Sequence, residues 1–453
     1  MTVRQSFSAL RVAAAFVLPA LFLCSSPAVS IAGEDDLLVA NVTLIDGTGA
    51  GPLPGASVLV SGDRIALVSP SDIEVADGAT VIDGTGKYLL PGLIDTHIHL
   101  RGGTVLGRVM NNRDLAVKAL HTFLYSGVTT VMDHGNSPDF IFPIRADERA
   151  GKILAPRVLA VGWAVHFARN SGSNDGPAVI MSRDDVARVL DNAFSHDPDL
   201  IKLVIDAEDM MAKDLVPVFP DVLTDVVHYA NRHGHRVTAH IGGREEFQTV
   251  INSGVNAFAH APIRNLLDEA ALNSVAVRAM PISTTAVVFS NIARVANDIS
   301  WFNTPLFQAT FDDATMKFNT VDERERYRRS GMPEQFARQI PNMLENLRLL
   351  HDSGALLALG SDRTYGPMTQ QELELYAQAG IPLLDIVTIA TRNAAMYIGH
   401  GDDLGTVSRG KLADLILLRE DPLEDVTNFA SVDTVIKAGR IVDLSALDLP
   451  VNK

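Results

Sequence analysis

The stretch Leu-Pro-Gly-Leu-Ile-Asp-Thr-His-Ile-His-Leu (residues 90–100) decides how this chain is interpreted. Its apolar residues indicate a buried strand, and in a strand residues two apart point to the same face, so the imidazoles of His97 and His99 converge. Two converging imidazoles are typical of a metal site. The spacing alone is weak, because 13 histidines among 453 residues should give roughly 0.4 such pairs by chance. A second pair does occur, at His233 and His235. The other ligands must therefore decide between the two pairs.

From residue 91 to residue 402, apolar strand candidates alternate with helical segments such as 114–126, 183–194 and 220–232. This alternation predicts a (β/α)8 TIM-like barrel. The stretch 291–350 is too long for one connection and has a helical pattern near its end, which predicts a flap near one face. The eight strand candidates are 93–98, 129–132, 158–165, 200–205, 237–241, 257–260, 279–284 and 356–359.

The two ends of the mature chain have a different pattern. Residues 33–90 contain short alternating apolar runs broken by Gly, Pro and Asp, and residues 403–453 return to short strands. Together they predict a small β-sandwich domain built from both chain ends. The glycine-rich run at residues 47–51 predicts a turn within this domain and not a phosphate loop, because no long helix follows it.

Residues 1–32 predict a signal peptide. Arg4 and Arg11 precede the apolar stretch 12–23, and Ser30-Ile31-Ala32 supplies the small residues of a cleavage site. The apolar stretch is short for a membrane anchor and contains a proline. We therefore expect export, to the periplasm or outside the cell.

The only cysteine, Cys24, lies in this leader. A lipoprotein cleavage box would need a small residue at the position of Leu23, which disfavours lipidation but leaves it open. The mature chain has no cysteine, so disulfides and thiol catalysis are excluded.

The acidic charge limits the partners. The leader holds two arginines and no acidic residue, so its removal changes the formal net charge from −16 to −18. Without a basic tract to offset this charge, nucleic acid and anionic membranes are poor partners, and a small-molecule substrate is expected. The run at residues 322–329 alternates in sign and predicts a solvated helix face. A homo-oligomer is compatible with the sequence.

Four further polar residues follow or belong to the predicted barrel strands. Lys202 lies in the fourth strand, and the fifth, sixth and eighth strands end at His240, His260 and Asp362. In a barrel these residues meet His97 and His99 at the carboxyl-terminal face, whereas His233 and His235 fall at the opposite face. Imidazole and carboxylate groups suit Zn²⁺ in a hydrolytic centre. An ammonium would repel a dication, so Lys202 fits only as a neutral amine or as a carbamate bridging two metals.

Several of these segments resemble the amidohydrolase superfamily, and the resemblance covers nearly the whole mature chain. The strand 4 lysine is similar to the binuclear branch that contains imidazolonepropionase-like proteins and secreted Xaa-Pro-type dipeptidases. The segments that carry the resemblance are 90–99, Ser-Gly-Val-Thr-Thr-Val-Met-Asp-His-Gly (126–135), those around His240 and His260, Leu-Gly-Ser-Asp (359–362), Ala-Thr-Arg-Asn-Ala-Ala (390–395) and Leu-Gly-Thr-Val-Ser-Arg-Gly-Lys-Leu-Ala-Asp-Leu-Ile-Leu-Leu (404–418).

The resemblance implies a role for each matching residue. His97, His99 and Asp362 would hold one divalent ion, His240 and His260 the other, and Lys202, N-carboxylated by CO2, would bridge both. The ions implied are Zn²⁺. Asp362 would also be the catalytic acid and base while a metal-bound hydroxide cleaves an amide or peptide C–N bond. The implied substrate is a dipeptide or an N-acyl amino acid.

The chain departs from the family after His240. Many relatives have an imidazole or aromatic residue there, whereas Ile241-Gly242-Gly243 follow here, which puts the usual recognition of a dipeptide carboxylate in doubt. Other side chains near strand ends are therefore candidate substrate contacts. The candidates are His134, His166, Arg363 and Tyr365, with Trp163, Arg169 and Arg244 beside them.

Three alternatives to amide hydrolysis follow from the same residues. A lactone or carbamate hydrolase fits the same centre. A mononuclear heterocycle deaminase would need a glutamate a few residues after His240 and no Lys202, but Glu245 and Glu246 lie farther off. A non-catalytic binding protein is disfavoured because all six expected metal positions carry suitable residues.

Overall fold

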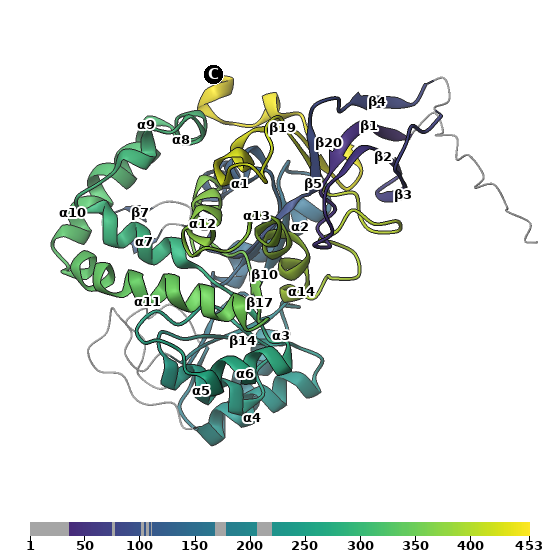
Figure 1. Cartoon of the computed structure of the whole chain (residues 1–453). Coiled ribbons are helices and arrows are strands. Elements are labelled where there is room, and N and C mark those ends of the chain that lie inside the picture. Colours follow the sequence, from purple (N-terminus) through teal and green to yellow (C-terminus); the bar gives the residue numbers. More distant parts are fainter. Residues whose placement is uncertain are drawn as a thin grey trace, which may run out of the picture.

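The computed structural model describes residues 36–74, 78–100, 104–105, 108–109, 111–167, 178–205 and 220–453 (Figure 1). The predicted signal peptide with Cys24, and the candidate contact Arg169, lie outside the described residues. Of the helices in the described ranges, none combines the length and the apolar character of a membrane span.

All eight predicted barrel strands are present, and they lie in two parallel sheets. The third strand is split in two, because Gly162, in the left-handed region (φ 73°), interrupts it. One sheet has the order β10-β9-β6, with bounds Arg157–Ala160, Val128–Asp133 and Leu93–Ile98. The other has the order β12-β11-β13-β14-β15-β16-β17, with bounds Val179–Ile180, Val165–Phe167, Ile201–Val204, Val237–His240, Ala257–Phe258, Pro281–Ser283 and Leu356–Ala358.

Backbone hydrogen bonds join the two sheets at β6. The Thr96 amide donates to the Leu359 carbonyl (2.8 Å) and the His99 amide to the Arg363 carbonyl (3.1 Å). Ile98 and Arg363 pair in parallel, so the end of β6 and the segment after β17 run side by side in the same direction. The residues that follow β6 and β17 therefore meet on one face. This is the local geometry that positions the site.

Helices flank these strands, and in Figure 1 α3 to α6 lie together on one side of the molecule and α7 to α11 on another. The α-helices are α1 (Arg113–Tyr125), α2 (Pro138–Arg149), α3 (Asp185–Phe194), α4 (Pro220–Arg232), α5 (Arg244–Ser253), α6 (Glu269–Arg278), α7 (Ala286–Val295), α8 (Pro305–Thr310), α9 (Asp313–Lys317), α10 (Glu323–Arg328), α11 (Met332–Asp352), α12 (Pro367–Gln378), α13 (Leu383–Thr388) and α14 (Ala394–Tyr397). Short 3-10 or π turns occupy Ser300–Asn303, Phe318–Asp322, Ile389–Asn393, Val426–Ala430, Leu444–Ala446 and Pro450–Asn452. A two-stranded hairpin of β7 (Thr104–Val105) and β8 (Arg108–Val109) follows β6.

The patterns of the two chain ends predict one small β-sandwich domain. In the structure the strands of both ends lie together, and all eight belong to a single hydrogen-bonded sheet. The ends meet where β5 pairs with β18 antiparallel, with Leu90 opposite Ile416. Residues from both ends share one apolar cluster, including Val39, Val58 and Leu415. The strands are β1 (Leu37–Leu44), β2 (Leu53–Ser61), β3 (Arg64–Ser69), β4 (Thr80–Asp83), β5 (Tyr88–Pro91), β18 (Leu415–Leu418), β19 (Val432–Lys437) and β20 (Arg440–Ile441).

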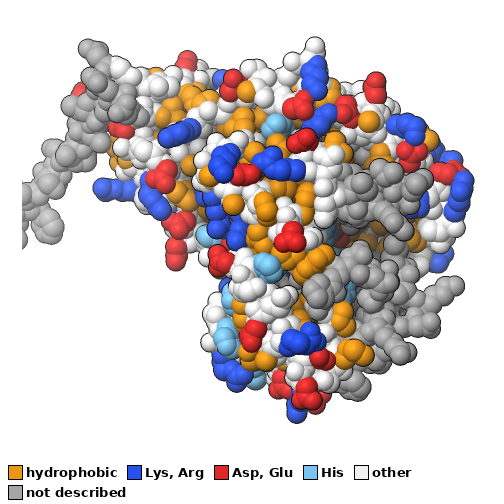
Figure 2. Space-filling view, turned by 180° about the vertical axis from the view of Figure 1, so that it is seen from behind, with side chains coloured by type: hydrophobic (Ala, Val, Ile, Leu, Met, Phe, Trp, Pro, Cys, Tyr) orange, Lys and Arg blue, Asp and Glu red, His pale blue; other side chains and the backbone are white. Residues whose placement is uncertain are grey.

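The long insertion before β17 forms several helices, α8 to α11, as expected for a flap. Asp312, just before α9, forms an ion pair with Lys118 of α1, which fastens this segment to the helix that follows β6. We call residues 305–328, which hold α8, α9 and α10, the flap. Figure 2 shows acidic and basic side chains interspersed over the reverse face of the molecule, without a large region of one sign.

We expect Gly366→Ala to lower the free energy of unfolding by about 1–3 kcal/mol or more, through steric overlap with α1. A Cβ on Gly366 would lie 2.2 Å from the Thr122 carbonyl oxygen and 2.7 Å from the Phe123 Cα, which are backbone atoms and cannot rotate away. Gly51→Ala is the matched control, because nothing lies within 4 Å of its Cβ position, and it should stay within about 0.5 kcal/mol of wild type. Denaturant unfolding of both variants measures the difference, and equal stabilities would contradict the packing described.

Candidate metal centre

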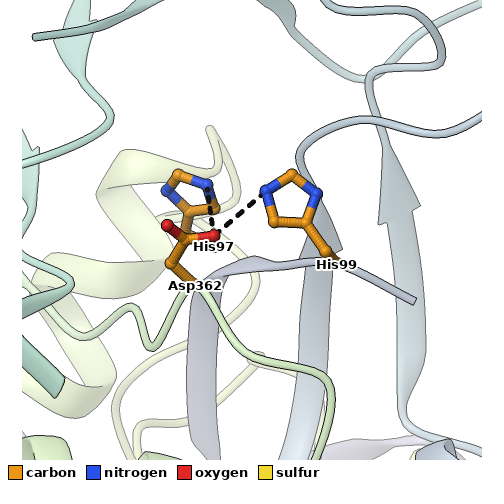
Figure 3. Close-up of side chains that lie close together, drawn as sticks. All are labelled: His97, His99 and Asp362. Carbon is orange, nitrogen blue, oxygen red and sulfur yellow. Dashed lines mark ion pairs between the residues drawn. The ribbon is translucent and has the colours of Figure 1, made fainter. Parts of the chain in front are cut away.

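The side chains of His97, His99 and Asp362 converge on one point (Figure 3). The Asp362 Oδ1 lies 3.6 Å from His97 Nε2 and 3.1 Å from His99 Nε2. His97 Nδ1 is 2.8 Å from the Ala259 carbonyl oxygen, which can only accept, so this nitrogen carries the proton and Nε2 presents its lone pair. The buried Nε2 has no hydrogen-bond partner among the described residues. A lone pair facing a carboxylate oxygen needs a cation between them, so these residues fit a metal ion.

The backbone of Asp362 is held in an unusual conformation. Its φ is 51°, in the left-handed region, and its amide donates to the His97 carbonyl (2.6 Å). Behind it, the buried Asp95 carboxylate accepts from the amides of Ser361 (3.0 Å) and His97 (3.2 Å). Burial raises the pKa of Asp95 to about 6. Asp95 therefore ties the two strand ends that present the ligands together.

A second pair of imidazoles, His240 and His260, lies beside the first group. The His260 ring centroid is 4.9 Å from that of His97 and 4.3 Å from that of His240. His260 Nδ1 is 2.7 Å from the Thr285 hydroxyl, which itself donates to the Thr284 carbonyl (2.8 Å). The hydroxyl proton is thus used, so Thr285 accepts from His260 and the Nε2 lone pair is free to bind an ion. Burial holds the pKa of His260 well below its usual value, which keeps the ring neutral.

Lys202 of β13 lies within the same cluster and is buried. Its Nζ is 3.5 Å from Nδ1 of His134, whose ring stacks on His97 with centroids 4.0 Å apart. Burial lowers the pKa of Lys202 to about 7, against the opposing charge of Asp362. A substantial neutral fraction of this amine is therefore present at neutral pH, which is the form that reacts with CO2.

The candidate substrate contacts divide into two groups. Arg363 and Tyr365 line a cavity of about 440 Å³ together with His99 and Asp362. His134 is fully buried behind His97, and His166 on β11 is half-buried; neither lines this cavity. Trp163 lines a smaller pocket with residues of α2 and α3, and Arg244 is exposed at the start of α5. His233 and His235 lie beyond α4, stacked against Phe194, apart from the metal group.

Two buried or half-buried glutamates, Glu323 and Glu372, were not among the residues predicted from the sequence. Glu323 belongs to the charge run that predicts a solvated helix face, yet its side chain is 16% exposed and faces the cavity and Arg363. That prediction is wrong for Glu323, because α10 turns it inward together with the buried Tyr327 of the same run. The buried Glu372 of α12 accepts from the Ala286 and Val287 amides, at 2.9 and 2.6 Å, and so caps α7. Of the residues that support the metal group, only Asp95 could have been found from the sequence, because it lies within the same motif as His97.

Comparison with known proteins settles the family. The sequence profile described as Amidohydrolase family matches residues 88–442. The chain belongs to the amidohydrolase family. It is 29% identical over 196 residues to an enamidase of Eubacterium barkeri, a match that covers 42% of this chain and 45% of the relative. An imidazolonepropionase of Thermoanaerobacter pseudethanolicus is 34% identical over 101 residues, or 20% of this chain and 24% of that one. The match thus spans less than half the length of these curated relatives.

The fold is similar to that of a Xaa-Pro dipeptidase whose crystal structure has methionine bound in the active site. The TM-score is 0.72 at 22% identity, over 90% of this chain and all of that chain (100%). The similarity to imidazolonepropionases and Xaa-Pro dipeptidases that the sequence motifs suggested is therefore confirmed, and at this identity the structural likeness concerns the fold.

Proposed function

We propose that this amidohydrolase is a metal-dependent hydrolase that cleaves the amide or peptide C–N bond of a small substrate. The observation that carries the proposal is the His97 Nε2 lone pair, buried without a partner among the described residues and aimed at a carboxylate oxygen that His99 also faces. The cavity beside this group is of a size that suits a small molecule. The matched C–N hydrolases support the choice of bond.

In this proposal His97, His99 and Asp362 would hold one divalent ion, and His240 and His260 the other. Lys202 would be a ligand of both as a carbamate, and its burial, which lowers its pKa to about 7, favours the neutral amine from which a carbamate forms. When bound, two Zn²⁺ ions would polarise the carbonyl and make a water molecule acidic enough to attack it.

Side chains of the protein transfer the proton, orient the substrate and exclude water. Asp362, a carboxylate within the metal group, takes the proton of the attacking water and delivers it to the leaving nitrogen. Arg363 and Tyr365 orient the substrate from the cavity wall. The flap adds Asp312, Thr315 and Glu323 to the cavity wall, with Glu323 beside Arg363, and excludes water.

Three finer features belong to the same proposal. The two parallel sheets form one (β/α)8 barrel, which the hydrogen bonds from β6 to Leu359 and Arg363 support, as does the Asp199 amide donating to Ala160 across the other seam. The chain ends form a β-sandwich domain of residues 33–90 and 403–453 around 91–402. Residues 1–32 direct export to the periplasm or outside the cell.

Metal analysis and a substrate panel test the proposal. Purified protein should contain two equivalents of divalent metal per chain, and a chelator should remove activity that added Zn²⁺ restores. The panel should contain dipeptides, N-acyl amino acids, carbamates and lactones, because ester-type substrates fit the same centre. Turnover of lactones or carbamates alone would replace amide hydrolysis with the alternative activity. One equivalent of metal would contradict the bridged pair.

The deaminase alternative is disfavoured by the surroundings of Glu246. This residue forms an ion pair with Arg264 at 2.7 Å, and both side chains are largely buried. A carboxylate held in this way is poorly placed to transfer protons at the metal group.

A further inference from the structure

The cavity beside the metal group contains a nearly buried cation, Arg363, with unused hydrogen-bonding capacity. The side chain of Arg363 is 14% exposed, and a guanidinium carries five N–H donors that stay charged at any physiological pH. Among the residues that the structure describes, no acceptor lies within hydrogen-bond distance of its guanidinium donors: the nearest carboxylate oxygen, Glu323 Oε2, is 3.8 Å from Nη2. A nearly buried charge with unfilled donors is poised for an anion.

The backbone of Arg363 is held beside the candidate metal ligands. The Arg363 carbonyl accepts from the His99 amide (3.1 Å), and the Arg363 amide donates to the Ser361 hydroxyl (3.3 Å). Arg363 also follows Asp362 directly in the chain, and both line the same cavity. An anion bound by Arg363 therefore lies on the Asp362 side of the centre. That is the side of the leaving nitrogen, since Asp362 protonates it.

The remaining walls of the cavity mix polar side chains, such as Asn112, Thr310 and Asn319, with apolar ones. The apolar side chains include Leu115, Ala119, Val288, Phe318, Tyr327 and Met368. Among its described residues, the wall has two other cations. Lys118 is paired with Asp312, and Arg326 is paired with Glu323 (3.4 Å), lies over the Tyr327 ring and is 53% exposed. The Tyr365 phenol is neutral, because burial raises its pKa to about 12. Of these three cations, Arg363 is the nearly buried one whose only ion pair among the described residues is long, which leaves its donors available to an anionic ligand with an apolar group.

We propose that Arg363 binds the carboxylate of the leaving amino acid, so that the enzyme selects N-acyl amino acids or dipeptides with a free carboxylate and an apolar leaving side chain. This inference rests on the proposed function for the bond that is cleaved. It also assigns a role to Glu323 on the flap, whose carboxylate oxygen lies 3.8 Å from the guanidinium. The substrate carboxylate competes with Glu323 and replaces its loose ion pair by direct hydrogen bonds. Arg363 substitutes for the recognition residue that the Gly242-Gly243 segment lacks.

Binding to chelator-treated protein tests this inference without turnover. Calorimetry with N-acetyl-L-leucine and with N-acetyl-L-leucinamide compares a carboxylate with its neutral amide. We expect wild type to bind the acid about 10-fold or more tightly than the amide, because charged hydrogen bonds are the stronger ones. Arg363→Gln should remove this preference while amide binding stays unchanged. Arg363→Lys should keep part of it, and Glu323→Gln should tighten acid binding several-fold.

Arg329→Gln is the matched control, because Arg329 is an exposed arginine just after α10, paired with Glu325. It should leave both affinities unchanged. Equal binding of acid and amide by wild type, or a preference retained in Arg363→Gln, would overturn the inference. If the preference depends on Arg363 but the metal-loaded enzyme hydrolyses no C–N bond, the carboxylate site stands and the proposed function fails. The two failures are therefore distinguishable.

Discussion

Asp362→Asn is expected to lower kcat by about 10³-fold while the protein stays folded, within the range that general acid and base groups contribute. The amide keeps the shape of the side chain but can neither take up a proton nor balance the charge of an ion shared with His97 and His99. Asparagine tolerates the left-handed backbone that this position requires (φ 51°) better than most residues do. Alanine at this position would add backbone strain of about 1–2 kcal/mol, which would confuse a catalytic loss with a folding loss.

The measurements for Asp362→Asn are the steady-state rate, the thermal unfolding midpoint and the metal content. Asp225→Asn is a suitable control, since Asp225 is exposed on α4 and pairs with Arg183 at the surface. We expect this control to match wild type in all three. A variant Asp362→Asn that retains more than about a tenth of the wild-type kcat would exclude proton transfer by this residue as a major contribution.

The strand pattern predicted that candidate ligands at several strand ends lie together, and the reason is physical. A buried parallel strand has a short apolar run as its sequence pattern. A polar residue that interrupts the run indicates the end of the strand, as at His97, His240 and Asp362. The convergence of these ends follows from the chain topology and needs no knowledge of side-chain packing. For this reason His97, His99 and Asp362 could be grouped from sequence, and the structure brings them together.

The cavity walls could not be predicted in the same way. The flap helices α8 to α10 are short, and which of their faces points inward depends on how the whole insertion folds back, which has no periodic signature. Glu323 and Arg326 are neighbours in one charge run, yet the Glu323 side chain is 16% exposed and that of Arg326 is 53% exposed. The buried role of His134 is also a tertiary effect, because only the packing of β9 against β6 stacks its ring on His97.

Lys202→Met is expected to lower activity by more than the roughly 10–100-fold that follows loss of an outer-shell partner of a metal site, because it removes a proposed bridging ligand. Methionine has nearly the length of lysine and no charge, so it fills the same buried space on β13 without leaving a cavity. Burying a neutral side chain in place of an amine should cost little stability. The metal content should fall below two equivalents per chain, and ¹³C-labelled bicarbonate should give a carbamate resonance in wild type that the variant lacks.

Lys202→Ala provides the sharper comparison, because it removes the same ligand but leaves the space empty. A short carboxylic acid such as propionate can enter that space and present its carboxylate where the carbamate would stand. Added propionate should therefore restore part of the activity of Lys202→Ala and none of the activity of Lys202→Met, in which the side chain blocks the space. Lys118→Ala, which breaks only the ion pair to the flap, should not respond to propionate. If Lys202→Met keeps wild-type turnover with two bound ions, Lys202 does not bridge them, and its burial beside His134 has a purely structural cause.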